Sequence, residues 1–166
     1  MADQACLALE IPERLHRDNK ELDPQFEESE LLYRRIAKGY MREDLRAGFS
    51  LDQGESVNRQ KYSKYPADVL FNIVNGQHRI GHAILAFEVS QVQQQIPRTE
   101  NNEEIIYSFR VTHRPERCMY PHCEIEVRRE GQLVTNAPPF VRKQLRDAIV
   151  DSQQRQVLIN HPLPTD

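Results

Sequence analysis

The chain has no apolar run that approaches the roughly 18–20 residues needed to cross a bilayer as a helix. Its first residues carry acidic side chains where a secretory signal peptide has a basic region, and no long apolar stretch follows them. Both absences predict a protein of the cytoplasm without a membrane partner.

Cysteine is also scarce: Cys6, Cys118 and Cys123 are three residues in 166, and their spacing follows no disulfide framework. An odd count in a chain expected in the cytoplasm predicts reduced thiols. The chain has no CxxC pair, no glycine-rich phosphate-binding loop, no internal repeat and no recognisable domain linker. A chain of this length can enclose one core, so a single domain is expected.

Charge is nearly balanced over the whole chain, with 22 basic and 25 acidic residues, which argues against a general electrostatic nucleic-acid binder. The acidic residues are concentrated at the start, because residues 1–30 hold nine of them against three basic residues. We expect residues 1–28 to form an acidic, weakly structured arm, and favour a solvated arm over one folded onto the body. The domain would span residues 29–160, and residues 161–166 would be a tail.

Hydrophobic patterns predict more strands than helices. Strands are expected at 31–36, 81–89, 105–111, 122–127, 132–135 and 156–160, and helical segments at 67–71, at 91–95 and from Pro138 onward. The connections are too short for a regular series of parallel βαβ units. The pattern therefore predicts a single α+β domain with a mainly antiparallel or mixed sheet and a few short helices.

Histidine and cysteine side chains gather at residues 112–124. A zinc site would use His113, Cys118 and one of His122 and Cys123, but neighbours on a strand point to opposite faces and no paired ligands occur elsewhere. A catalytic thiolate at Cys118 with His122 as its base would need a helix-borne cysteine, which the sequence does not indicate. We therefore predict neither a metal nor a cofactor.

The segment from Ser56 to Ser63 concentrates hydroxyl, amide and cationic donors, which suit an anion or the backbone of a partner. Tyr62 and Tyr65 add stacking surfaces beside its basic residues. An exposed polar loop accounts for the same residues equally well.

Several motifs occur in a fixed order along the chain: residues 31–36, 56–63, 66–70, 81–89 and 120–125. In this order they resemble a group of small uncharacterised bacterial proteins that share a tyrosine–arginine strand, a serine–valine–asparagine–arginine segment and a late strand that begins with histidine. The resemblance spans about residues 31–127 and implies no function. The positions that match it are Arg34, Ser56, Asn58, Arg59 and His122, and its pattern does not place cysteine at 118 or 123.

The chain is also similar to ADP-ribosyltransferase-like toxin domains. Tyr33 and Arg34 on an early strand, and a serine at position 63 before the segment 67–71, correspond to that layout. Such enzymes imply a catalytic glutamate, for which Glu124 and Glu126 are the candidates here.

Two hypotheses of function follow. The leading one is a small bacterial accessory or regulatory binding protein within a larger assembly, with a protein partner and with nucleic acid as a further option. The alternative is an enzyme that acts on a nucleotide or nucleic acid, in which Arg34, Ser56 and Arg59 line one cleft and His122 is the acid or base. A pocket shared by Arg34, Arg59 and His122 would favour the enzyme or ligand site.

Overall fold

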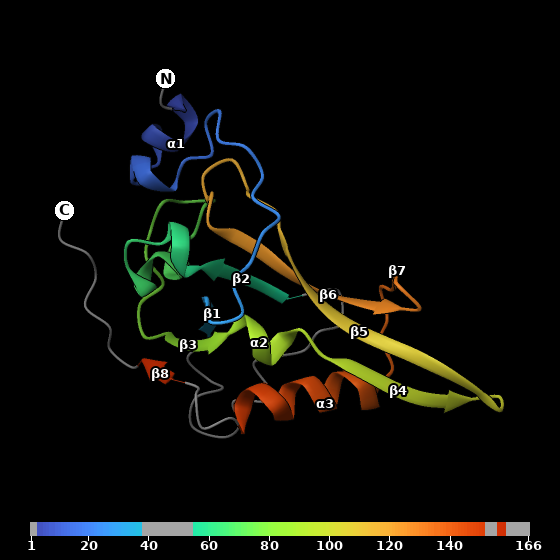
Figure 1. The fold of residues 1–166 in the computed structure, drawn as a ribbon. Coiled ribbons are helices and arrows are strands. Elements are labelled where there is room, and N and C mark those ends of the chain that lie inside the picture. The colour runs from blue at the N-terminus through green and yellow to red at the C-terminus, as the bar shows by residue number, and fades with distance from the viewer. Residues whose placement is uncertain (1–2, 38–54, 152–155, 159–166) are drawn as a thin grey trace.

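A computed structural model describes residues 3–37, 55–151 and 156–158. The strands of these residues form one antiparallel sheet in the order β4-β5-β6-β2-β1-β3-β8, with β7 paired to β6 (Figure 1). They are β1 (Leu31–Ile36), β2 (Glu55–Arg59), β3 (Ala83–Glu88), β4 (Gln95–Glu100), β5 (Glu103–His113), β6 (His122–Arg129), β7 (Gln132–Leu133) and β8 (Gln156–Leu158). The helices are α1 (Gln4–Ala8), α2 (Val89–Val92) and α3 (Pro139–Val150), with 3₁₀ helices η1 (Glu13–Leu15), η3 (Gln60–Tyr62) and η4 (Pro66–Leu70). The expected α+β domain with an antiparallel sheet and a few short helices is confirmed.

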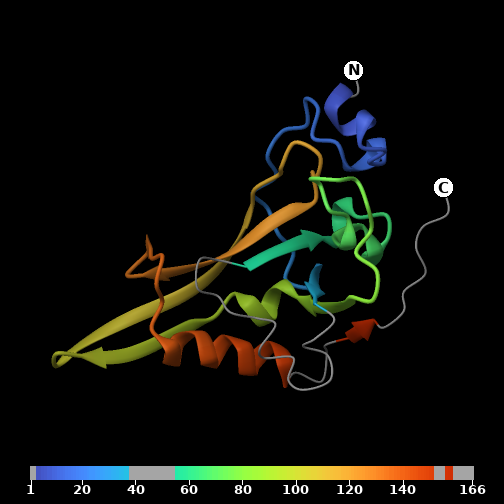
Figure 2. The same cartoon turned by 180° about the vertical axis from the view of Figure 1, so that it is seen from behind.

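Both faces of the sheet are covered at β3, as its continuous apolar sequence predicts. Leu85 and Phe87 point to the first face, where they join the main core with residues of α2 and α3. Ile84 and Ala86 point to the second face and pack against residues of η4. Figures 1 and 2 show α3 beside α2 and β4. The first face of the sheet, which α3 covers, is called the α3 face below, and the second face, which η4 covers, is called the η4 face.

Several local predictions hold. Val141, Leu145 and Ile149 recur every four residues in α3 and are fully buried, as expected of a helix with one apolar side. The β6–β7 hairpin turns at Glu130 and Gly131, which both have positive φ angles, of 48° and 77°. The expected helix at 67–71 is a 3₁₀ helix, η4, that begins at a proline.

Other segments differ from expectation. Two strands, β4 and β5, form a hairpin where the sequence predicts only a strand at 105–111, and its turn residues Asn101 and Asn102 have φ angles of 52° and 65°. Asparagine tolerates this left-handed conformation, and two such residues in a row match the twist of the flanking strands. The helical turn expected at 91–95 is shorter than predicted, because α2 ends at Val92 and Gln95 already begins β4.

The N-terminal segment does not form a solvated arm. Residues 3–21, which we call the N-terminal cap, contain α1 and η1, and bury Ile11 and Leu15 against Met119 and the segment that joins β5 to β6 (Figure 1). Backbone hydrogen bonds fix the contact, since Tyr120 donates to the carbonyl of Leu15 at 2.7 Å. The acidic segment packs on the sheet and does not stay solvated because the apolar residues spaced along it gain free energy when they are buried.

The prediction of three reduced thiols is also wrong. Cys6 and Cys118 form a disulfide across 112 positions of the sequence, and Cys123 is a buried free thiol. The spacing of two cysteines gives no sign of such a bond, because the partners come together only when the cap packs on the sheet. Within the described residues, no helix has both the length and the apolar character needed to cross a membrane.

Candidate functional site

Three of the expected site residues, Ser56, Asn58 and Arg59, lie on strand β2. Alternate side chains of a strand point to opposite faces of the sheet, so these three residues do not all point the same way. Val57 points to the α3 face and belongs to its core, and Arg59 has the same parity. Ser56 and Asn58 therefore point to the η4 face. Asn58 is paired across the sheet with His122 of β6, which brings these two expected residues together.

A cavity of about 260 Å³ opens on the η4 face. Its lining residues are Arg34, Arg35, Ser56, Asn58, Val69, Phe71, Ile73, Arg79, Glu116, Met119 and His122. Four of the five residues expected to form a site are among them. The cavity, which we call the η4 pocket, thus combines hydroxyl, amide, imidazole and guanidinium groups and the carboxylate of Glu116 with an apolar wall.

His122 has one ring nitrogen occupied. Its Nδ1 lies 2.6 Å from the backbone carbonyl of Arg114, an acceptor, so Nδ1 carries the proton. The other nitrogen, Nε2, lies 3.9 Å from a carboxylate oxygen of Glu116. The side chain is largely buried. The ring is therefore held through Nδ1, and Nε2 is the ring nitrogen on the side of Glu116.

Two arginines give the pocket its electrostatic character. Burial, followed by the charges of Arg79 and Arg34, lowers the pKa of Arg35. Burial, together with the charges of Arg35 and Arg79, lowers the pKa of His82, whose Nδ1 is 3.4 Å from a guanidinium nitrogen of Arg35. In the described part of the chain, neither Arg35 nor Arg79 forms an ion pair with a carboxylate.

Arg34 differs from these two arginines because its charge is compensated. Its guanidinium group forms an ion pair with the buried carboxylate of Glu55 and donates to the carbonyl of Ser56 at 3.1 Å. Arg34 is thus a lining residue of the pocket, but its guanidinium group is bound to Glu55, which has the same parity in β2 as Val57 of the α3 face.

Arg59 does not belong to the pocket, which corrects the expected cleft of Arg34, Arg59 and His122. It is fully buried on the α3 face, where two guanidinium nitrogens each lie 2.8 Å from the carboxylate of Glu30. It also donates to the backbone carbonyls of Asp23 and Gln25, and stacks on the ring of Phe26 at 3.9 Å. These bonds hold residues 23–30 on the sheet, so the role of Arg59 is structural.

The expected basic and aromatic patch is likewise occupied by contacts inside the molecule. Hydrogen bonds from Lys61 and Tyr62 hold the pKa of Asp23 well below its ordinary value. Tyr62 also stacks on His113, with 5.6 Å between the ring centroids. The segment 56–63 is therefore a strand and a 3₁₀ turn that hold residues 23–30 in place.

His113, one of the proposed zinc ligands, has both ring nitrogens bound. Nδ1 accepts from the backbone amide of Asp23 at 3.0 Å, and Nε2 donates to the carbonyl of Tyr120 at 2.8 Å. Burial lowers the pKa of this histidine. Burial raises the pKa of Cys123, and Cys118 is in the disulfide, so no thiolate is available here. The described residues hold no cluster that suits a metal ion.

Of the two glutamates expected from ADP-ribosyltransferase-like domains, Glu124 lies opposite Ser56 in the pairing of β6 with β2 and forms an ion pair with Arg114 at 3.5 Å. Tyr33 and Arg34 point to opposite faces of β1, and Tyr33 is buried against η4. Burial raises the pKa of Glu126, but hydrogen bonds from Arg128 and Arg114 outweigh it and keep the pKa below its ordinary value. Glu126 is thus a structural carboxylate.

The sequence did not indicate Arg35, Arg79 and Glu116 as site residues. Arg35 follows an expected site residue, but only the pairing of β1 with β3 brings it beside His82. The chain matches no protein-family model, no curated protein and no solved structure. The function of the pocket therefore has to follow from its geometry.

Proposed function

We propose that this chain is a non-catalytic binding module whose η4 pocket takes an anionic group of a partner. The observation that carries the proposal is the pair Arg35 and Arg79, two guanidinium groups that lie at one pocket without a carboxylate partner in the described residues. Two neighbouring cations in a partly buried site repel each other, and an anion removes this repulsion while it accepts charge-assisted hydrogen bonds. In a bacterial assembly, such a module would act as an accessory or regulatory subunit.

The size and lining of the pocket limit the ligand. Its 260 Å³ is below the roughly 300–1,000 Å³ of sites that enclose whole small molecules. A carboxylate or phosphate group fits such a space, with Ser56 and Asn58 as further donors. Phe71, Ile73 and Met119 would contact the apolar part of the side chain that bears this group.

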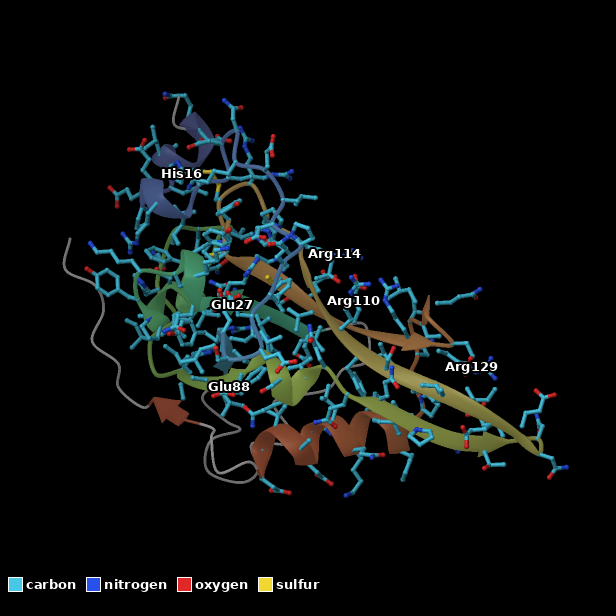
Figure 3. All side chains as sticks on the ribbon, in the orientation of Figure 1. His16, Glu27, Glu88, Arg110, Arg114 and Arg129 are labelled. Carbon is cyan, nitrogen blue, oxygen red and sulfur yellow. A yellow bond between two sulfur atoms is a disulfide. The ribbon has the colours of Figure 1, made fainter. Side chains whose placement is uncertain are left out.

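A protein partner is favoured over nucleic acid. Nucleic-acid binding needs uncompensated cations spread over a surface. Arginines are spread out in this way on β5 and β6 and just beyond β5, as Arg110, Arg114 and Arg129 show (Figure 3), but glutamates neutralise most of them. Arg114 and Arg128 pair with Glu126, and Arg129 pairs with Glu100.

The test is binding of inorganic phosphate and of acetate, followed by NMR titration of the arginine side chains. We expect binding by the wild type and at least a tenfold loss in Arg35→Gln and in Arg79→Gln. The matched control is Arg110→Gln, because Arg110 is an exposed arginine of β5 outside the pocket. It should bind like the wild type.

Stability provides a second readout of the same variants. Since each substitution removes one of two repelling charges, Arg35→Gln and Arg79→Gln should unfold at the same temperature as the wild type or higher. Loss of binding without loss of stability is typical of a functional site. If neither anion binds, or if both variants are destabilised, these arginines are structural and the proposal fails.

An enzyme remains the second candidate because of His122 alone. A ring with Nδ1–H bound to a backbone carbonyl and Nε2 at a pocket has the arrangement of a general base. Under this alternative, the protein would hydrolyse a phosphate ester or NAD, and His122→Gln would abolish turnover while anion binding persists. Binding without turnover in the wild type supports the module.

A further inference from the structure

Two aliphatic side chains are far more exposed than the others of their kind among the described residues. Val74 is 81% exposed and Ile80 is 85% exposed. Each directly follows a lining residue of the pocket in the sequence, since Val74 comes after Ile73 and Ile80 comes after Arg79. Isolated exposed aliphatic residues are ordinary, but these two share one short loop with Arg79, which has no carboxylate partner among the described residues.

The loop that carries them, residues 71–82, is held in one conformation. Phe71 and His78 form a β-bridge, and their rings lie 3.8 Å apart between centroids. The amide of Asn72 donates to the carbonyl of Gln77 at 2.9 Å, and the amide of Arg79 donates to the carbonyl of Leu70 at 3.0 Å. A surface fixed before binding loses little conformational entropy when a partner docks.

The loop is also fastened to the N-terminal cap. Gly76 has a φ of 70°, and a Cβ atom at this position would lie 1.8 Å from the carbonyl oxygen of Leu9. This close approach places the loop directly on the cap. The exposure of Val74 and Ile80 is therefore a property of a packed loop and does not result from a loose one.

We propose that the loop 71–82 and the η4 pocket together bind a protein segment in which an acidic side chain is flanked by aliphatic side chains. The proposal rests on the function proposed above and names its partner. The acidic side chain enters the pocket and meets Arg35 and Arg79. The flanking side chains stay outside, because the pocket holds only one group, and they cover Val74 and Ile80.

Charge and size argue for this occupant over a free small ligand. A free phosphate or acetate ion would satisfy the arginines and leave Val74 and Ile80 in water. A nucleotide would add a polar sugar where the exposed side chains are aliphatic. A peptide segment contacts both parts, since an acidic residue and its neighbours lie within one or two residues along the chain.

The experiment measures fluorescence anisotropy with three labelled peptides. The first carries one glutamate between leucines, the second replaces the glutamate with glutamine, and the third replaces the leucines with serines. We expect the first to bind best, and each change to weaken binding by roughly tenfold or more, which corresponds to loss of one charged contact or of two partly buried aliphatic contacts.

Protein variants separate this inference from the function on which it rests. Val74→Ser combined with Ile80→Ser should weaken binding of the first peptide to the level of the third, while inorganic phosphate binds as before. Leu133→Ser, a change of an exposed leucine on β7, should leave both unchanged. All three positions are on the surface, so the thermal midpoint should stay constant.

Three outcomes would overturn the inference. In the first, the double variant binds the first peptide as tightly as the wild type does. In the second, adenosine monophosphate binds more tightly than this peptide. In the third, sedimentation shows self-association that the double variant loses, which assigns the surface to a second copy of the chain. Failure of phosphate to bind would instead contradict the proposed function itself.

Discussion

Breaking the disulfide between Cys6 and Cys118 is expected to lower the free energy of unfolding by about 5 kcal/mol. The bond closes a loop of 112 positions, and a loop of this length restricts the unfolded chain by an entropy equivalent to about 5 kcal/mol at room temperature. Domains of this size are stable by roughly 5–15 kcal/mol, so the reduced chain would be only marginally folded.

The assay is urea unfolding of the oxidised protein, of the reduced protein and of the variant Cys6→Ala with Cys118→Ala. The matched control is Cys123→Ala, because Cys123 is also buried but forms no disulfide. This control removes one buried sulfur, and its cost should be close to that of a small cavity, about 1–2 kcal/mol. The paired variant should resemble the reduced protein and should not respond to reductant.

Thiol titration checks the bond directly. Because Cys123 is buried and its pKa is raised, the native oxidised protein should show no reactive thiol. Unfolding without reductant should expose one thiol, and unfolding with reductant should expose three. The reasoning is refuted if three thiols react without reductant, or if the oxidised and reduced proteins have the same urea midpoint.

Three further predictions concern packing and charge. Gly76→Ala should destabilise the protein by several kcal/mol, whereas Gly131→Ala, with a similar φ but open space around it, should cost only about 1–2 kcal/mol in thermal unfolding. His113 has a pKa below its ordinary value of 6.5, so the unfolded chain takes up the proton first and stability should fall as pH drops below 6.5, a slope that His113→Gln should reduce. Arg59→Met should cost about 3–5 kcal/mol in urea unfolding because it leaves a buried carboxylate unpaired, whereas Lys61→Gln, at an exposed pair, should cost about 1 kcal/mol or less. Equal effects within either pair of variants, or a flat profile between pH 7 and 5, would contradict the corresponding argument.

The parts of the fold that the sequence predicts are those where burial alone shapes the pattern. β3 is apolar throughout because both of its faces are covered, and α3 repeats its apolar residues every four positions because one side is covered. The burial of β2 is not visible in its hydrophobic pattern. Its sequence reads as a polar loop, yet four of its five residues are buried, because ion pairs and hydrogen bonds within the fold satisfy Glu55, Asn58 and Arg59.

The misassignment of β2 also explains the error in the site. Treated as a loop, the segment gives no reason to separate Ser56 and Asn58 from Arg59. Treated as a strand, its alternation sends the first two to the η4 face with His122 and the third to the α3 face. Composition therefore predicted the donors of the segment, and only the pairing of strands determined which of them lie together.

The N-terminal cap and its disulfide, neither of which was predicted from the sequence, both contact residues that line the pocket. Glu116 and Met119 line the pocket and belong to the same segment as Cys118, which the disulfide joins to α1. Met119 packs with Leu15 of the cap, and Phe71 of the pocket wall packs against the same cluster. The cap thus supports the part of the pocket wall that Met119 and Phe71 form only as long as it stays docked. The acidic segment that was expected to be a solvated arm is therefore a structural support of the η4 pocket.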